Sequence, residues 1–201
     1  MPSLYLIRHG RTAWNAQWRI QGSEDVPLDD EGRRQAAALA RALAHTPLAA
    51  VYASPLQRAQ ETGAAIAAAH ALPLHLDARL QERHWGAYQG LRREEAARLH
   101  AEAEADLRRD PAAARPPGGE SYLELQERAE AALRDIAQGA EGQVAVVCHG
   151  GTIVAGLMAL LGLRTWPQVR FLIENASITL LDLAADGRVV THYVNRCDHL
   201  A

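Results

Sequence analysis

Two short apolar segments of this chain lead into a histidine, and the stretches between such segments have helical periodicity. One arginine separates residues 4–7 from His9, and residues 144–148 directly precede His149. Short, continuous apolar runs are typical of buried strands. In open α/β sheets, ligands bind beyond the carboxyl ends of the strands. A histidine after each of two strands therefore predicts a site at that edge.

Further strands and helices alternate along the first half of the chain. An apolar spacing of i, i+3, i+4 and i+7 predicts a helix that begins at Asp30. Residues 50–53 predict a strand, and Ser54 followed by a proline predicts the N-cap of a helix that reaches about His70. Residues 74–76 predict another short strand.

The C-terminal half continues this alternation. Ser121 and Glu124 form a capping box in front of a helix with an apolar stripe. An Asp-Gly pair lies between the apolar segments 177–183 and 188–194 and predicts a β-hairpin. Strands that alternate with helices predict an α/β fold, a three-layer α-β-α sandwich with a mostly parallel central sheet.

The length of 201 residues suits a single domain, 1–201. The Pro- and Gly-rich segment 111–119 is too short for an interdomain linker, so we expect a surface loop there. The wider segment 92–119 is rich in Ala, Glu and Arg, which favours helix. We expect it to be a lid-like helical segment that sets substrate choice.

Composition narrows the classes of partner. The 24 acidic and 21 basic residues give a net charge of −3, so no basic surplus indicates nucleic acid or an anionic membrane surface. No stretch approaches the roughly 18 apolar residues of a membrane span. Cys148 and Cys197 form no motif, which favours a reducing compartment, and we expect a cytoplasmic protein.

The nine histidines do not have the spacings of a metal site. The chain contains no HExxH, no H-x-H and no cysteine pair at zinc spacing. His192 and His199 have only Asp198 as a nearby acid. We therefore expect no metal.

Four residues have the chemistry that phosphoryl transfer needs. The imidazole of His9 is a nucleophile when neutral, and the positive charge of Arg8 disfavours its protonation. Arg8 and Arg58 could each hold a phosphate, Arg58 with help from the start of its helix. Glu82 could act as a general acid. Taken singly, each residue has a structural alternative: a strand-end histidine, a surface arginine or a loop carboxylate.

Taken together, the segments that contain these residues resemble the histidine phosphatase superfamily, the group that includes cofactor-dependent phosphoglycerate mutase. The matching blocks extend over nearly the whole chain, in order and with the family's spacing. They are LIRHGRTAWN (6–15), IQGSEDVPLDDEG (20–32), YASPLQRAQET (52–62), LQERHWGAYQGL (80–91), PPGGES (116–121), VVCHGGTI (146–153) and ENASITLLDL (174–183).

The resemblance implies a role for each matching residue. His9 would carry the phosphoryl group, and Glu82 would donate a proton to the leaving oxygen and later activate water. The remaining site positions would bind phosphate or border it; they are Arg8, Arg58, His149, Thr12, Asn15, Gly22 and Gly150. Fold analogy adds a homodimer as an expectation. We assign Trp14, Trp18 and Trp85 to packing rather than to the pocket.

The resemblance implies a phosphatase that acts on a small phosphorylated metabolite and needs no cofactor. The alternative is a mutase, which would use 2,3-bisphosphoglycerate. Mutases carry an inserted segment with paired basic residues, and this chain is shorter by roughly that segment. Trp85 also lies where mutases have a tyrosine. A non-catalytic phosphate-binding domain is the third alternative, but such relatives usually lack the nucleophile or the acid.

Overall fold

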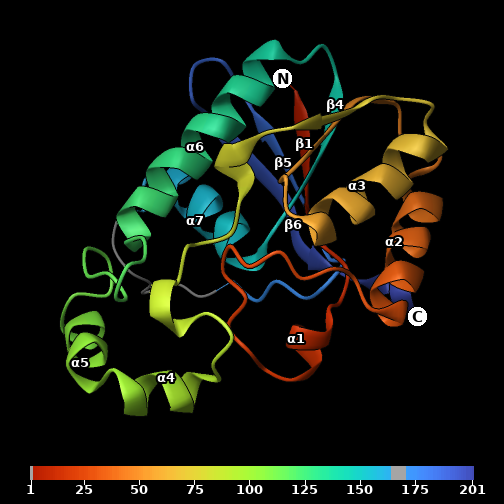
Figure 1. Cartoon of the computed structure of the whole chain (residues 1–201). Coiled ribbons are helices and arrows are strands. Elements are labelled where there is room, and N and C mark those ends of the chain that lie inside the picture. The colour runs from red at the N-terminus through yellow and green to blue at the C-terminus, as the bar shows by residue number, and fades with distance from the viewer. Residues whose placement is uncertain (1, 164–170) are drawn as a thin grey trace.

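The described residues form one six-stranded sheet in the order β3-β2-β4-β1-β5-β6 (Figure 1). This computed structural model describes residues 2–163 and 171–201. Four neighbouring strands are parallel; the fifth, β5, is antiparallel to β1, and β6 is antiparallel to β5. The parallel strands are β3 (Leu74–Leu76), β2 (Leu48–Ala53), β4 (Gln143–Cys148) and β1 (Ser3–Arg8), and the antiparallel strands are β5 (Ile178–Leu183) and β6 (Val189–Arg196).

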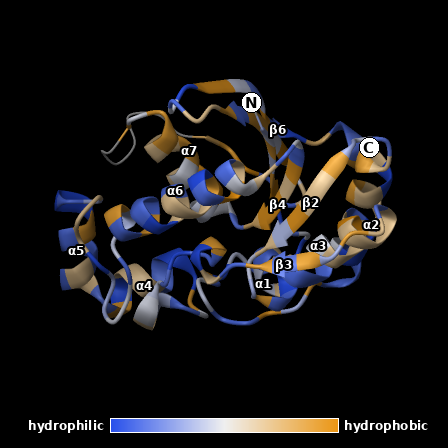
Figure 2. Cartoon of the chain, turned by 90° about the horizontal axis from the view of Figure 1, so that it is seen from above, coloured by the Kyte–Doolittle hydropathy of each residue, from blue (hydrophilic) through white to orange (hydrophobic). Residues whose placement is uncertain are grey.

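Helices cover both faces of this sheet. The helices α2 (Asp30–Leu43) and α3 (Gln57–Ala69) pack on one face, and α6 (Tyr122–Gly139) and α7 (Gly150–Leu160) pack on the other. Successive strand residues point to opposite faces, so Leu6 joins the core beneath α6 and α7, whereas Ile7 joins the core beneath α2 and α3. Figure 2 shows the hydrophobic strands between these layers. The predicted mostly parallel α-β-α sandwich is confirmed.

Helix caps determine where two of these helices begin. The Asp29 carboxylate accepts the N–H of Gly32 and caps α2. The predicted capping box of Ser121 and Glu124 is present at the start of α6. The predicted cap of α3 is wrong: α3 begins at Gln57, and no side chain caps it. The hydroxyl of Ser54 instead lies 2.8 Å from a ring nitrogen of His149, so Ser54 is part of the candidate site.

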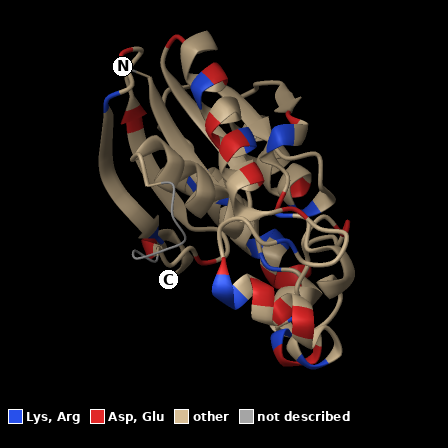
Figure 3. Cartoon of the chain, turned by 90° about the vertical axis from the view of Figure 1, so that its left-hand side faces the viewer, with Lys and Arg blue, Asp and Glu red and all other residues tan. Residues whose placement is uncertain are grey.

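Shorter elements complete the chain. The helix α1 (Ala13–Ala16) follows β1, and α4 (Arg93–Leu99) and α5 (Ala101–Arg109) lie outside the three layers in Figure 1. Figure 3 shows acidic and basic residues interspersed in this lower part of the molecule. Among the described residues, the single-turn 3-10 helices η1 (Ala78–Leu80) and η2 (Gly86–Tyr88) lie between β3 and α4, and η3 (Asp198–Leu200) follows β6. Within residues 2–163 and 171–201, no helix is long and apolar enough to cross a membrane.

Candidate active site

Three neighbouring parallel strands end at the same edge of the sheet and bring polar side chains together there. Ser54 follows β2, His149 follows β4 and His9 follows β1. The rings of His9 and His149 lie 5.1 Å apart between centroids, so the two histidines predicted to share a site do so. A cavity of about 290 Å³ opens beside them, lined by Arg8, His9, Asn15, Arg19, Ile20, Gln21, Gly22, Arg58, Glu82, Trp85 and Arg93.

The imidazole of His9 is buried and held in one orientation. Its Nδ1 lies 2.6 Å from the carbonyl oxygen of Gly10. A carbonyl oxygen only accepts, so Nδ1 carries the proton and Nε2 keeps its lone pair. Burial lowers the pKa of His9 well below its usual value, and the nearby charges of Arg58 and Arg8 lower it further. At neutral pH His9 is therefore an uncharged base with one unprotonated ring nitrogen.

Two guanidinium groups, of the buried Arg58 and the half-buried Arg8, provide positive charge beside His9. Arg58 is fully buried, and it donates to the carbonyl oxygens of Gly22 and Glu24 at 2.7 and 2.6 Å. Burial lowers the pKa of Arg58 to about 10. Arg8 donates to the carbonyl oxygen of Ile173, but its buried Nε has no hydrogen-bond partner among the described residues. A buried cation with an unpartnered donor is stabilised by an anion, so this arrangement favours an anionic ligand.

His149 is completely buried, and both of its ring nitrogens have partners. Arg58 Nε donates to Nδ1 at 3.2 Å, and Nε2 lies 2.8 Å from Ser54 Oγ. Burial lowers the pKa of His149 well below its usual value, with Arg58 as the next cause. His149 is thus a second neutral imidazole, and in this arrangement it orients Arg58 rather than presenting a free N–H to the cavity.

The carboxylate of Glu82 lies at the start of α7. It accepts the N–H of Gly151 at 3.0 Å and the N–H of Arg83 at 2.8 Å. A Cβ atom on Gly151 would overlap this carboxylate, which explains the second glycine after His149. The loop that carries Glu82 is held from the other side, where Arg83 donates to the carbonyl oxygen of Glu120.

Asn15 and Gly22 line the cavity, as the resemblance implies, but Thr12 and Gly150 are not among its lining residues. The buried hydroxyl of Thr12 lies 3.1 Å from Asn15 Oδ1 and 2.9 Å from Gln21 Oε1 and can donate its one proton to either, so Thr12 orients residues that line the cavity. Gly150 begins α7, and a Cβ atom there would lie 3.5 Å from Arg8 Nε.

The structure adds residues that sequence reasoning did not find. Arg19 and Arg93 line the cavity, and the side-chain amide of Asn175 donates to the carbonyl oxygen of His9 at 3.1 Å. Asn175 lies in a matching block, ENASITLLDL, so its position was a usable signal. The two arginines lie in segments where charged residues are frequent, and nothing in the sequence distinguishes them from solvent-exposed charges.

The packing assignment of the tryptophans needs two corrections. Trp85 lines the cavity, and the guanidinium carbons of Arg83 and Arg93 lie 4.4 and 4.9 Å from its ring centroid. Cation–π contacts of this kind hold arginine side chains in place. Trp18 is 84% exposed and has a positive φ of 57°, so it does not contribute to the core.

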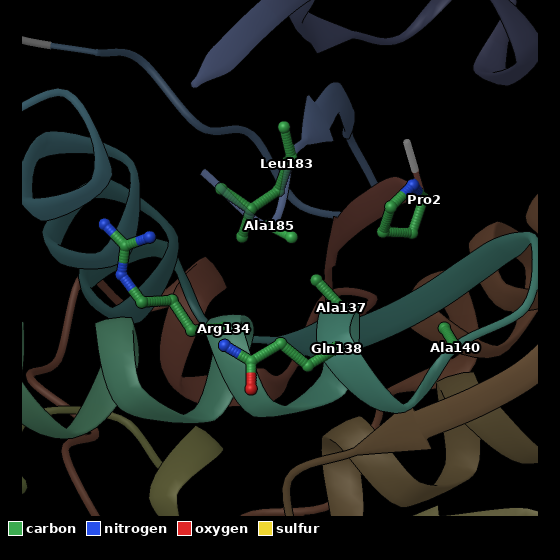
Figure 4. A pocket seen from close by; sticks show the side chains of 8 residues that line it. Pro2, Arg134, Ala137, Gln138, Ala140, Leu183 and Ala185 are labelled. Atoms are coloured by element: carbon green, nitrogen blue, oxygen red, sulfur yellow. The ribbon is translucent and has the colours of Figure 1, made fainter. Parts of the chain in front are cut away.

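Another cavity, of about 240 Å³, lies at the opposite end of β1 from His9 (Figure 4). Its lining includes Pro2, Leu183 and several alanines. Arg134 is the one charged residue among its described lining, and it pairs with Glu130 at 2.8 Å. None of the described lining residues is a catalytic acid, base or nucleophile. Among the described side chains, no group of three His, Cys, Asp or Glu residues could hold a metal ion.

The site thus combines a neutral imidazole, buried guanidinium groups and a carboxylate at the carboxyl edge of an α/β sheet. Phosphoryl transfer depends mainly on positioning and on neutralising the charge of the phosphoryl oxygens, and this set of groups suits that chemistry. The model of the histidine phosphatase superfamily (branch 1) matches residues 4–196. The chain belongs to this superfamily.

Individual relatives agree with this assignment. A glucosyl-3-phosphoglycerate phosphatase of Mycolicibacterium vanbaalenii is 36% identical over 180 residues, 82% of this chain and 77% of that protein. A probable phosphoglycerate mutase (GpmB) of Escherichia coli is 33% identical over 185 residues, 90% of this chain and 85% of that protein. The structure of a mycobacterial glucosyl-3-phosphoglycerate phosphatase with VO3 has a TM-score of 0.86 at 32% identity and covers 97% of this chain and 99% of that one. The chain is an enzyme of the phosphatase type, with mutase activity as the weaker alternative.

Proposed function

We propose that this enzyme hydrolyses a small phosphomonoester through a phosphohistidine on His9. The observation that carries the proposal is the hydrogen bond from His9 Nδ1 to the carbonyl oxygen of Gly10. This bond leaves Nε2 as the unprotonated nitrogen of a side chain that lines a cavity with Arg8 and Arg58. A nucleophile needs a free lone pair, and a phosphate dianion needs nearby cations.

In the first step, His9 Nε2 attacks phosphorus and the ester P–O bond breaks. Glu82, in its protonated form, gives its proton to the leaving oxygen, and an alcohol departs. In the second step, the Glu82 carboxylate takes a proton from water while the water oxygen attacks phosphorus and the P–N bond breaks. Inorganic phosphate leaves, and both His9 and Glu82 return to their starting protonation states.

Arg8 and Arg58 would stabilise the transferring phosphoryl group in both steps. Each donor aimed at developing charge contributes roughly 3 kcal/mol, about 10²-fold in rate. The unpartnered Nε of Arg8 supports this role. Because guanidinium groups supply the positive charge, we propose that the reaction needs no metal or other cofactor.

The positive charge of the cavity exceeds what one phosphate requires. Arg19 and Arg93 line it in addition to Arg8 and Arg58, and Glu82 is the one acidic residue among its described lining. No described residue hydrogen-bonds or ion-pairs with the guanidinium of Arg93, whose contact is with the Trp85 ring. We therefore favour a phosphorylated carboxylic acid as the substrate, bound so that its carboxylate lies near Arg93.

The cellular location and the oligomeric state of the enzyme stay proposals. Cys148 and Cys197 are both free thiols, which supports a cytoplasmic location. The homodimer expected from fold analogy also stays a proposal. Light scattering of the purified protein would measure its mass in solution directly.

The experiment compares two substrates that differ in one group, 3-phosphoglycerate and glycerol 3-phosphate. We expect phosphate release from both, with a higher kcat/KM for the carboxylate, and we expect Arg93→Ala to remove that preference. His9→Ala should abolish release, and Glu82→Gln should slow it severely. Undiminished turnover by His9→Ala would contradict the proposal, and tight phosphate binding without any turnover would favour a non-catalytic domain.

A further inference from the structure

The hydroxyl of Ser54 is buried deep in the site but does not line the cavity. Ser54 is completely buried, and its backbone N–H donates to the carbonyl oxygen of Val147, which extends the pairing of β2 with β4. Its Oγ accepts the N–H of Leu56 at 3.3 Å and lies 2.8 Å from His149 Nε2. The serine that resembled a helix cap is therefore fixed beside a histidine of the site.

The partners of His149 determine its tautomer. Arg58 Nε is only a donor, so His149 Nδ1 must accept. A neutral imidazole then carries its proton on Nε2 and donates it to Ser54 Oγ. A proton on Nδ1 would point one N–H at another, and the guanidinium of Arg58 would have to move. The ring of His149 thus transmits the position of Ser54 to Arg58.

Arg58 depends on this contact for its orientation. Its guanidinium is held on three sides, by the carbonyl oxygens of Gly22 and Glu24 and by Nδ1 of His149. Among residues 2–163 and 171–201, no carboxylate hydrogen-bonds to it. Two of its N–H groups therefore remain for a phosphoryl group, and their direction follows from the three acceptors.

We propose that Ser54 is a positioning residue for phosphoryl transfer, because its hydroxyl accepts the Nε2–H of His149 and so holds the ring that aligns Arg58. This inference rests on the proposed function for its kinetic consequence, but the hydrogen bond itself can be observed without turnover. Ser54 touches neither the substrate nor the reacting atoms in this account. Its effect passes through His149 and Arg58.

The test compares Ser54→Ala with a matched control, Ser177→Ala. Ser177 is as deeply buried, but its Oγ has no hydrogen-bond partner among the described residues. Proton–nitrogen NMR of nitrogen-15-labelled histidine reports the Nε2–H group of His149 and its hydrogen bond. We expect the Nε2–H form in the wild type and in both variants, because Arg58 still donates to Nδ1. In Ser54→Ala the Nε2–H proton resonance should move upfield because its acceptor is lost, and in Ser177→Ala it should stay at the wild-type position.

Kinetics with p-nitrophenyl phosphate gives the second readout. We expect Ser54→Ala to lower kcat by roughly 10-fold or more, with KM changed less than about threefold, because Arg58 binds more strongly in the transition state. Ser177→Ala should keep the wild-type kcat. Ser54→Thr retains the hydroxyl and should keep the hydrogen-bonded Nε2–H resonance and most of kcat; if its extra methyl prevents folding, the two alanine variants still decide.

Two results would overturn the proposal. One is an Nε2–H proton resonance of His149 that is unchanged in Ser54→Ala. The other is a changed resonance with kcat equal to that of Ser177→Ala. Absence of turnover by the wild type would contradict the proposed function instead, and the NMR comparison would still decide whether Ser54 accepts the Nε2–H of His149.

Discussion

Two neutral imidazoles and two guanidinium groups lie within one site, and the charge of the arginines favours the neutral form of the histidines. Burial is the larger cause that lowers the pKa of His9 and His149 and keeps them unprotonated. The charges of Arg8 and Arg58 lower these pKa values further. The neutral ring of His149 accepts a hydrogen bond from Arg58, and the neutral ring of His9 keeps a lone pair on Nε2 for a phosphoryl group. At the residue scale, the function depends on which ring nitrogen carries a proton.

Arg58→Lys tests the geometry of one guanidinium without removing its charge. A lysine ammonium cannot bond Gly22, Glu24 and His149 at once in the plane that Arg58 occupies. We expect kcat/KM to fall by about 10²-fold. Arg41→Lys, on the exposed face of α2, is the control and should change little. Equal kcat/KM for the two variants in steady-state assays would contradict the role given to Arg58.

Stability should depend on pH because of the buried histidines. The pKa of His9 is lowered on folding, so below the unfolded value of about 6.5 the unfolded chain binds more protons than the native one. The free energy of unfolding should therefore fall as the pH drops below about 6.5. Urea unfolding at pH 7.5 and 5.5 measures this, and His9→Gln should reduce the difference. If the free energy of unfolding fell as steeply between pH 7.5 and 5.5 in His9→Gln as in the exposed control His45→Gln, the pKa of His9 would not be lowered by folding.

At this scale the sequence identifies the groups but not their partners. His9, Arg8, Arg58 and Glu82 stand out because strand ends, a helix start and family blocks mark them. Ser54 was assigned to a helix cap, which is a local signal. Its hydrogen bond to His149 joins residues 95 positions apart and could not be read from the neighbouring sequence. Arg93 was part of a helical segment, and only the fold shows that it lines the cavity.

At the scale of elements, the loop after β1 is held by a backbone-to-backbone contact with α2. A Cβ atom on Gly32, in the first turn of α2, would overlap the carbonyl oxygen of Arg11. A Cβ atom on Gly10 would in turn overlap the carbonyl oxygen of Gly32. The segment that fixes the Nδ1 proton of His9 therefore depends on close approach to a helix, which only glycine permits.

Gly32→Ala should destabilise the protein, although alanine is the better helix former. We expect a loss of at least about 2 kcal/mol in the free energy of unfolding, because backbone atoms cannot yield as side chains do. Activity should fall as well, since Gly10 would be displaced. Gly139→Ala at the end of α6, where nothing lies within 4 Å of the added atom, should be neutral or stabilising. Thermal and urea unfolding compare the two, and equal stability would refute the contact.

The elements themselves were largely predictable. The strands at residues 4–7 and 144–148 and the hairpin lie within a residue or two of their predicted bounds, because apolar runs and an Asp-Gly turn are local signals. Strand order is not a local signal. The neighbours β4 and β1 are separated by most of the chain, and the sequence alone does not specify that pairing.

At the scale of the whole molecule, a three-layer body supports the site, and α4 and α5 lie outside it (Figure 1). The first residue of α4, Arg93, lines the cavity. The segment 92–119, predicted to be a lid, thus supplies one cationic residue near the nucleophile, and its role in substrate choice stays a prediction.

Hydrolysis and phosphoryl exchange can be separated in one assay. A mutase must keep water away from the phosphohistidine, and this chain is shorter by roughly the inserted segment that the resemblance associates with mutases. Incubation with 3-phosphoglycerate and a trace of 2,3-bisphosphoglycerate should therefore release inorganic phosphate with little isomerisation. Rapid formation of 2-phosphoglycerate without phosphate release would identify a mutase instead.

The covalent intermediate tests the central claim most directly. The enzyme is quenched during turnover of a phosphomonoester, digested under alkaline conditions that preserve phosphohistidine, and the labelled peptide is sequenced by mass spectrometry. We expect an acid-labile phosphoryl group on His9 that is absent from His9→Ala. A label on any other residue, or continued hydrolysis with no labelled histidine, would contradict the account.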